Sequence, residues 1–126
     1  MSISIARLDH VVLNVTDMDR SIAFYEAVLG CKVERTVERI GLVQMRAGAC
    51  LIDLFPAKAK PETPNMDHFA LRVDPWNVDE ITAHLEKHGV ERGDTVTRYG
   101  AEGDGPSIYI KDPDGNTVEL KGPPVG

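Results

Sequence analysis

Cysteine and long apolar runs are both scarce in this sequence. The 126 residues include two cysteines, Cys31 and Cys50, and their spacing fits neither a CxxC metal motif nor a disulfide framework. We therefore expect two buried free thiols. No stretch approaches the length of a membrane span, and the first residues lack the apolar run of a signal peptide. The sequence predicts a cytoplasmic protein that does not act on membranes.

Basic residues are also in the minority. Lys and Arg number 14 against 20 Asp and Glu, which gives a net charge of -6 and a pI near 5.1. Nucleic acids and anionic membranes bind to basic faces, so this balance argues against both. A small molecule is the better candidate partner. The apolar content of 42% is ordinary for a globular domain with one core.

The chain contains an internal repeat. The segment Leu8–Val15, LDHVVLNV, matches Met66–Val73, MDHFALRV, and aligns His10 with His68. Similarity at a fixed offset is a sign of repeated architecture. Apolar residues alternate along both segments, which indicates two equivalent strands.

A helical pattern follows each of these strands. One runs from Asp17 to Gly30 and the other from Asp74 to Gly89. Asp17 and Asp74 are predicted N-caps, with Pro75 at the first helical position, and each glycine is a predicted left-handed C-cap. We expect one helix in each half.

Each half then continues as strand-like sequence broken by turns, and it ends with a carboxylate between two apolar residues. Asp53 ends the first half in this way and Glu119 the second. Asp112 to Asn116 is a strong turn signal before the last strand. The prediction is an α+β fold in which each half is a strand, a helix and about three more strands.

The domain boundaries follow from the same pattern. We interpret the chain as one domain, with module 1 at about residues 5–55 and module 2 at about 66–121. A proline-containing stretch at 56–65 is the predicted linker, because proline interrupts regular structure.

Strand geometry predicts which side chains share a face. Neighbouring side chains of a strand point to opposite faces, so His10 faces away from Leu13. The same alternation separates His68, Asp53 and Glu119 from the apolar residues beside them. We expect the four polar side chains to line one concave sheet surface.

Two imidazoles and two carboxylates on one surface predict a metal site. A single strand histidine is usually structural, and a single acid is usually solvated, but four at repeat-matched positions are harder to explain in this way. Burying two carboxylates without a cation costs several kcal/mol. We expect a divalent ion, Ni, Zn, Co, Mn or Fe, bound by His10, Asp53, His68 and Glu119.

Four segments resemble one known superfamily. They are DHxxLxV from Asp9, SIAFYEAVLG at Ser21–Gly30, DHFALRV from Asp67, and SIYIKDPDGNTVEL at Ser107–Leu120. Together they resemble the vicinal oxygen chelate superfamily of glyoxalase I, extradiol dioxygenases, methylmalonyl-CoA epimerase, fosfomycin-resistance thiol transferases and bleomycin-binding proteins. The resemblance implies two tandem βαβββ modules that form an open eight-stranded metal-binding cup, usually within a homodimer.

The resemblance also assigns roles to the four polar residues. His10, His68 and Glu119 match the metal ligands that glyoxalases, epimerases and dioxygenases share. Asp53 matches the fourth ligand, which is generally Glu in glyoxalase I. Asp is one methylene shorter than Glu, which leaves three roles open for Asp53: it binds the metal directly, it binds through a water molecule, or it serves as a base. Glu119 and Asp53 are the predicted catalytic carboxylates.

Several reactions fit this site. A glyoxalase-like lyase or isomerase, with glutathione as a possible cosubstrate, uses two carboxylates beside the metal to move a proton. An Fe(II) extradiol-type dioxygenase needs only two histidines and one carboxylate, but the histidine expected before Tyr109 is missing. A fosfomycin-type thiol transferase and a non-catalytic binding or resistance protein also fit the resemblance. We expect the lyase.

The predicted substrate contacts are Asn14, Arg72, Arg98 and Tyr109, with Tyr99 beside Arg98.

Both halves leave unpaired strand edges, which an open cup does not close by itself. Exposed edges favour pairing with a second copy of the chain. The sequence therefore predicts a homodimer.

Overall fold

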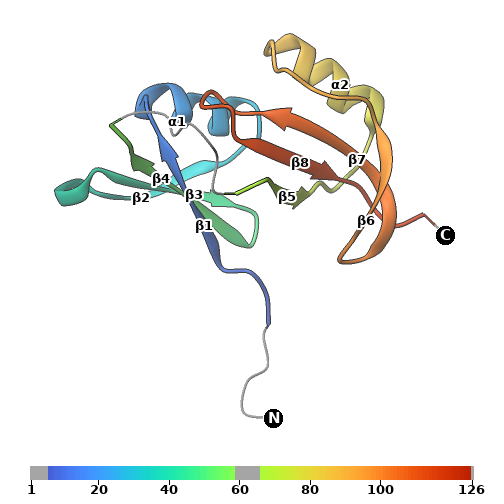
Figure 1. Cartoon of the computed structure of the whole chain (residues 1–126), viewed down its shortest axis with the longest axis horizontal. Helices are drawn as coiled ribbons and strands as arrows, with labels where there is room; N and C mark the ends of the chain where they lie inside the picture. The colour runs from blue at the N-terminus through green and yellow to red at the C-terminus, as the bar shows by residue number, and fades with distance from the viewer. Residues whose placement is uncertain (1–5, 59–65, 126) are drawn as a thin grey trace. The chain divides into compact units, whose positions relative to one another are not determined.

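Each half of the repeat forms one βαβββ unit. The computed structural model describes residues 6–58 and 66–125, and the chain divides into two compact units, Met1–Lys60 and Pro61–Gly126 (Figure 1). The first unit contains β1 (His10–Val15), α1 (Met18–Ala27), β2 (Lys32–Val37), a short 3-10 helix (Glu38–Ile40), β3 (Leu42–Ala47) and β4 (Cys50–Pro56). The second contains β5 (Phe69–Arg72), α2 (Val78–Lys87), β6 (Val96–Gly100), β7 (Gly103–Lys111) and β8 (Thr117–Lys121). The predicted α+β fold is confirmed. Within the predicted linker, 59–65 lie outside the described residues.

The two sheets have the same strand order. The first is β1-β4-β3-β2 and the second is β5-β8-β7-β6. In each, the first strand runs parallel to the last, and the other neighbours are antiparallel. Each histidine segment is thereby placed beside the strand that carries the corresponding carboxylate.

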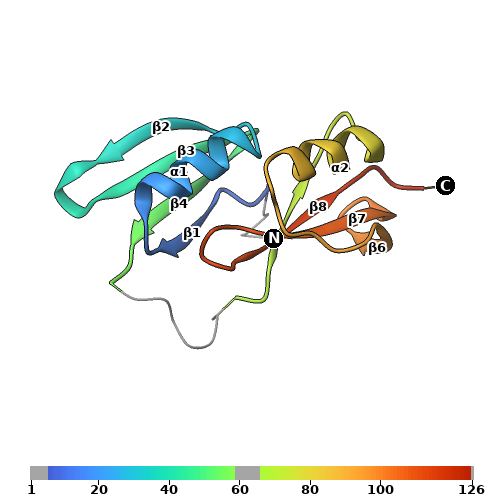
Figure 2. The same cartoon turned by 90° about the horizontal axis from the view of Figure 1, so that it is seen from above.

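The alternation predicted for the strands is present in β1. Leu13 and Val15 are buried, whereas His10 and Val12 are exposed. In the first unit, α1 contacts β4 and β2 and buries Tyr25 (Figure 2). The helix therefore covers the apolar face and leaves the histidine-bearing face to the site.

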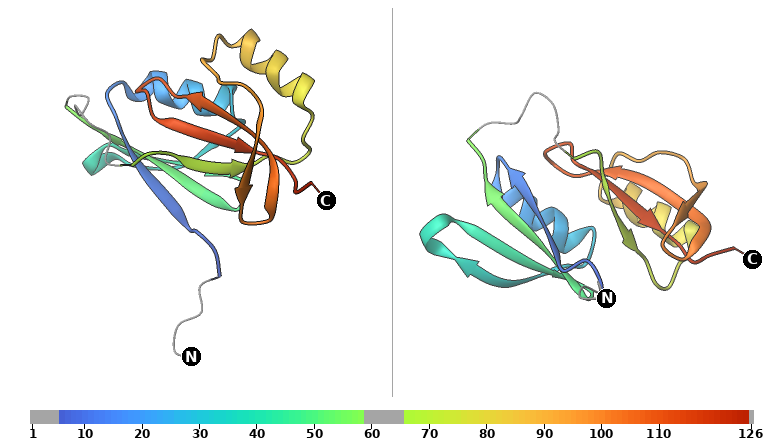
Figure 3. Two further views of the ribbon diagram at one scale, coloured as in Figure 1. Left: turned by 45° about the vertical axis from the view of Figure 1, so that its right-hand side comes forward. Right: turned by 60° about the horizontal axis from the view of Figure 1, so that its bottom comes forward.

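The second sheet repeats this arrangement. The helix α2 lies along the sheet of its own unit and buries Leu85 (Figure 3). Ile108, Ile110 and Val118 are buried in the strands. One apolar face of each sheet therefore forms a core with its own helix.

One of the two predicted helix starts is correct. Asp17 caps α1, since its side chain accepts a hydrogen bond from the backbone N of Arg20 at 3.0 Å. Asp74 does not cap α2 and Pro75 is not its first residue, since the helix begins at Val78, so both predictions were wrong. Asn77 is the cap, because its side chain accepts from the backbone N of Glu80 at 3.1 Å.

The ends of the helices follow the prediction. Gly30 and Gly89 have φ values of 68° and 64°, in the left-handed region that glycine adopts without strain. Both helices have 10 residues. No helix in the described parts of the chain is long and apolar enough to cross a membrane.

Both cysteines are free thiols. Cys31 is buried, as predicted, whereas Cys50 is only half-buried. Burial raises the pKa of Cys31 to about 11, and the charge of Cys50 adds to this rise. Cys31 is therefore a protonated, unreactive thiol near neutral pH.

The turn between β7 and β8 is held by a buried carboxylate. Oδ1 of Asp112 accepts from the backbone N of Asp114 at 3.0 Å and of Asn116 at 2.8 Å, and Oδ2 accepts from Asn116 Nδ2 at 2.8 Å. Because this turn leads into β8, it fixes the start of the strand that carries Glu119. The predicted turn is confirmed.

We expect Asp112→Ala to lower the free energy of unfolding by about 3 kcal/mol, because it leaves several turn donors without their carboxylate. Urea denaturation followed by circular dichroism measures the change. Asp94→Ala removes an exposed carboxylate of the same unit and is the matched control. A change below about 0.5 kcal/mol, the ordinary range for surface substitutions, would contradict the role of Asp112.

Candidate functional site

The first unit brings His10 and Asp53 to neighbouring strands. His10 begins β1, and its side chain is 47% exposed. Asp53 lies in the middle of β4, beside Val12 on one side and Gln44 on the other. Although charged, Asp53 is only 3% exposed.

The two oxygens of Asp53 have different surroundings. Gln44 Nε2 donates to Oδ2 at 3.1 Å. Oδ1 is buried and has no hydrogen-bond partner among the described residues. A buried carboxylate oxygen without a partner is costly. It is therefore available to a ligand of this unit.

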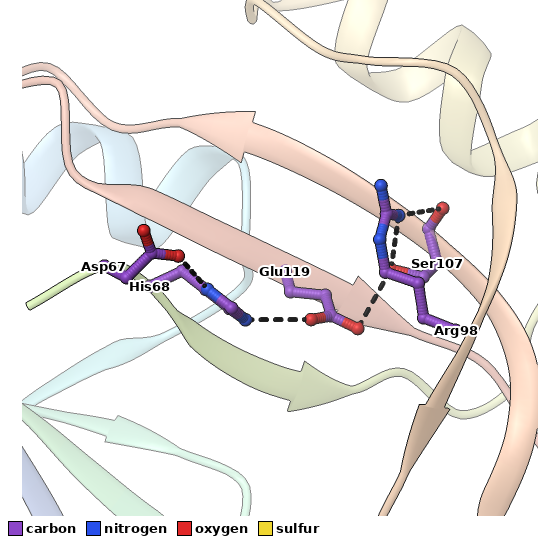
Figure 4. A network of polar contacts seen from close by, with 5 residues as sticks. All are labelled: Asp67, His68, Arg98, Ser107 and Glu119. Carbon is purple, nitrogen blue, oxygen red and sulfur yellow. Dashed lines mark hydrogen bonds and ion pairs between the residues drawn. The ribbon is translucent and has the colours of Figure 1, made fainter.

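The second unit brings His68 and Glu119 into direct contact. His68 directly precedes β5, and Glu119 lies in the middle of β8 beside Ala70 and Tyr109. The Nε2 atom of His68 is 3.1 Å from Glu119 Oε1 (Figure 4). Glu119 is 6% exposed, so this is a buried carboxylate with an imidazole as its partner.

The two pairs occupy equivalent places in the two sheets. Asp53 lies beside Val12, two residues after His10, and Glu119 lies beside Ala70, two residues after His68. The repeat of the sequence is therefore also a repeat of strand register. Each unit contributes one imidazole and one buried carboxylate.

An aspartate orients each histidine. Nδ1 of His10 is 2.8 Å from Asp9 Oδ2, and Nδ1 of His68 is 2.6 Å from Asp67 Oδ2. A carboxylate can only accept here, so each Nδ1 donates to its aspartate. Nε2 is then the nitrogen that a metal would use, and in His68 it faces Glu119 Oε1, so an ion would take the place of the hydrogen between these two atoms. The hydrogen bond to Asp9 raises the pKa of His10 above its usual value, against the effect of desolvation, and the charge of Asp53 adds to the rise.

The structure brings the predicted ligands together as two pairs. Across residues 6–58 and 66–125, no group of three or more His, Cys, Asp and Glu side chains is placed to hold a metal ion by itself. The pairing of His68 with Glu119 is direct. Binding of one ion by all four residues stays a prediction, because it joins residues of both units.

The predicted substrate contacts have different surroundings. Asn14 is exposed on β1. Arg72 is engaged by an ion pair from Nε to Glu102 Oε1 at 2.8 Å and by a hydrogen bond to the Val73 carbonyl at 2.6 Å. Its guanidinium therefore holds the hairpin between β6 and β7, which contains Glu102.

Arg98 and Tyr109 lie beside the His68 pair. The guanidinium of Arg98 is 3.9 Å from the centre of the Tyr109 ring, and that ring is 5.2 Å from the ring of His68. Arg98 Nη1 also donates to Ser107 Oγ at 2.9 Å. Tyr99, in contrast, is 81% exposed.

Sequence reasoning missed Gln44 and Ser107 as partners of the two carboxylates. Ser107 Oγ donates to Glu119 Oε2 at 2.9 Å. Ser107 lies two residues before Tyr109 on β7, so strand alternation already places both on one face. Gln44 pairs directly with Asp53 across β3 and β4, a register that only the sheet reveals.

Comparison with known proteins shows relatives along nearly the whole chain. The profile of the Glyoxalase/Bleomycin resistance protein/Dioxygenase superfamily matches residues 7–120. Virulence protein STM3117 of Salmonella typhimurium is 32% identical over 92% of this chain and 83% of its own length. Its crystal structure matches with a TM-score of 0.81 at 31% identity, covering 96% of this chain and 99% of that one.

One further relative and one structural neighbour have informative names. Lactoylglutathione lyase of Salmonella typhimurium is 32% identical over 90% of each chain. FosX, a fosfomycin resistance protein of Listeria monocytogenes, matches with a TM-score of 0.76, covers 94% of each chain and is 24% identical, which shows the fold alone. A FosX variant was crystallised with Mn(II) and a dihydroxypropylphosphonic acid. This chain, with its two βαβββ units, belongs to the glyoxalase/bleomycin resistance protein/dioxygenase superfamily.

Proposed function

We propose that this chain binds one divalent metal ion through His10, Asp53, His68 and Glu119 and acts as a glyoxalase-like lyase or isomerase. The observation that supports this best is the repeated pair of one imidazole and one buried carboxylate at the same register in both sheets. Two nitrogen and two oxygen donors suit Ni, Zn, Co, Mn or Fe.

The residues present fit such an ion. Asp53 Oδ1 is buried without a partner among the described residues, and a cation would neutralise this charge. Asp9 and Asp67 accept hydrogen bonds from Nδ1 of the two histidines, so a metal would bind to each Nε2, which in His68 now faces Glu119 Oε1. When bound, the metal would polarise a substrate oxygen and stabilise the negative charge that develops there.

The two carboxylates would have different tasks. Both oxygens of Glu119 are engaged, Oε1 by His68 and Oε2 by Ser107, so its orientation is fixed. Asp53 has one oxygen held by Gln44, and the other has no partner in the described parts of the chain. We assign to Asp53 Oδ1 the transfer of a proton between adjacent carbons of the substrate, as a general base and then a general acid, which requires this oxygen to be free of the metal while the proton moves.

The substrate class follows from the reaction and from the relatives. The 32% identity to a lactoylglutathione lyase supports an adduct of a thiol with a reactive carbonyl compound, with glutathione as cosubstrate. Dioxygenase chemistry of the extradiol type has less support, because no histidine follows His88 in the sequence. The likeness to FosX concerns the fold and does not favour thiol transfer.

The assembly is also a proposal. The strands β1 and β5 are edge strands of their sheets. Such edges favour pairing with a second copy, and we propose a homodimer on this ground. The cytoplasmic location stays a prediction of the sequence.

Metal analysis of the purified protein, followed by an assay on the hemithioacetal of methylglyoxal and glutathione, tests the proposal. We expect about one Ni, Zn, Co, Mn or Fe per four-ligand site, and turnover that a chelator abolishes and metal restores. A protein that binds none of these metals would overturn the metal site. Metal binding without turnover of this or other thiol adducts would overturn the lyase assignment alone.

A further inference from the structure

A chain of hydrogen bonds leads from Arg98 through Ser107 to Glu119 (Figure 4). Arg98 Nη1 is 2.9 Å from Ser107 Oγ, and Oγ is 2.9 Å from Glu119 Oε2. Ser107 is fully buried. Neither Ser107 nor Arg98 is one of the four proposed metal ligands, so the contact of Ser107 with Glu119, and that of Arg98 with Ser107, need a separate explanation.

The chemistry of the three groups fixes the direction of both bonds. A guanidinium can only donate, so Ser107 Oγ accepts from Arg98. A serine hydroxyl has one proton, which is then the one donated to Glu119 Oε2. Glu119 Oε2 is therefore held as an acceptor. The oxygen of Glu119 that faces His68 Nε2 is Oε1, at 3.1 Å.

Arg98 is itself held in place. Its guanidinium stacks on the ring of Tyr109 at 3.9 Å and donates a second bond, at 3.3 Å, to the Ser107 carbonyl. Tyr109 lies beside Glu119 in the sheet, so the stack is anchored to the strand pair that carries the carboxylate. Arg98 is thus engaged by protein partners, which argues against its predicted role as a substrate contact.

We propose that Ser107 and Arg98 are positioning residues that hold the Glu119 carboxylate so that Oε1 is presented, together with His68 Nε2, to the metal. This inference rests on the proposed metal site. The first unit meets the same need with Gln44, a neutral donor to Asp53. The second unit uses a hydroxyl whose direction is set by a cation, Arg98. The hydrogen bonds from Gln44 and Ser107 both end on a carboxylate, and such charge-assisted bonds are the stronger kind.

The dissociation constant of Co(II), measured by calorimetric titration and by the visible spectrum of the bound ion, tests the proposal. Removing an outer hydrogen-bond partner of a metal ligand typically weakens binding about 10- to 100-fold, and we expect a loss of this size for Ser107→Ala. Ser107→Thr keeps the hydroxyl and should restore both the affinity and the spectrum. Equal losses in the two variants would overturn the proposal.

Arg98→Met provides a second variant that leaves buried Ser107 unchanged, should Ser107→Ala not fold. It removes the donor but keeps a side chain that can pack on Tyr109. We expect weaker Co(II) binding, and no further loss when Arg98→Met is added to Ser107→Ala, because Arg98 acts through Ser107. Arg92→Met, which breaks an ion pair with Glu86 in the same unit, is the matched control for loss of charge.

The possible results separate this inference from the proposed function. Unchanged Co(II) affinity in Ser107→Ala and Arg98→Met, with a wild-type chain that binds the ion, would overturn the positioning role alone. Equal losses in Arg92→Met and Arg98→Met would also overturn it, since net charge would then explain both. A wild-type chain that binds no Co(II) or other divalent metal would overturn the metal site and this inference together.

Discussion

His68→Ala is expected to abolish stoichiometric metal binding while the chain keeps its fold. His68 is the direct partner of Glu119 and a predicted ligand, so its loss removes one donor atom and releases a buried carboxylate oxygen. Metal affinity should fall by more than the factor of about 10 to 100 that is typical when only a hydrogen-bond partner of a metal ligand is removed. Turnover should fall with the metal. Elemental analysis after gel filtration measures metal content.

His88→Ala is the control for this variant. His88 is an exposed residue at the end of α2, outside the two His–carboxylate pairs. It should retain the wild-type metal content. Thermal unfolding of metal-free His68→Ala should show a cooperative transition. Its free energy of unfolding should be lower than that of the wild type by about 1–3 kcal/mol, because Glu119 Oε1 loses its partner. Unchanged metal content in His68→Ala would contradict its assignment as a ligand.

Asp53→Asn should have opposite effects on stability and on activity. In the metal-free protein, the variant replaces a buried charge, one oxygen of which lacks a partner among the described residues, with a neutral amide whose oxygen can still accept from Gln44. We expect the free energy of unfolding to rise by about 1–3 kcal/mol. Turnover should fall about 10²- to 10⁴-fold, the usual contribution of a positioned base, with metal still held by three ligands.

Urea denaturation of the metal-free proteins and steady-state kinetics of the metal-loaded proteins measure these two effects. Asp94→Asn, at an exposed position, is the matched control and should change neither. A metal-free Asp53→Asn that is less stable than wild type would show that Asp53 Oδ1 has a favourable protein partner after all. Full turnover in Asp53→Asn would exclude Asp53 as the base.

Both predictions concern carboxylates that are buried in a sheet, where their burial lowers the stability of the fold and their charge serves the proposed function. Asp53 and Glu119 lie in central strands where apolar residues such as Ile52 and Val118 are fully buried. A carboxylate at such a place stabilises nothing by itself. Its presence in both units at the same register is what gives the metal proposal its support.

Much of the fold could be predicted because the repeat is visible in local patterns. Alternation in Leu8–Val15 and Met66–Val73 identified the first strand of each half, and Gly30 and Gly89 marked the helix ends. Asp74 followed by Pro75 predicts a helix start, because proline is common at the first position of a helix. Asn77 is the actual cap, since only the backbone shows which side chain reaches the first free N–H groups.

The sequence by itself determined the residue types, the faces and the presence of one histidine and one carboxylate in each half. These are properties of strand period and of similarity between two segments. Only the tertiary structure decided the partners of the carboxylates: Gln44 for Asp53, and His68 and Ser107 for Glu119. Hydrogen bonds between strands depend on register and on short distances, and neither is encoded in the order of residues along one strand.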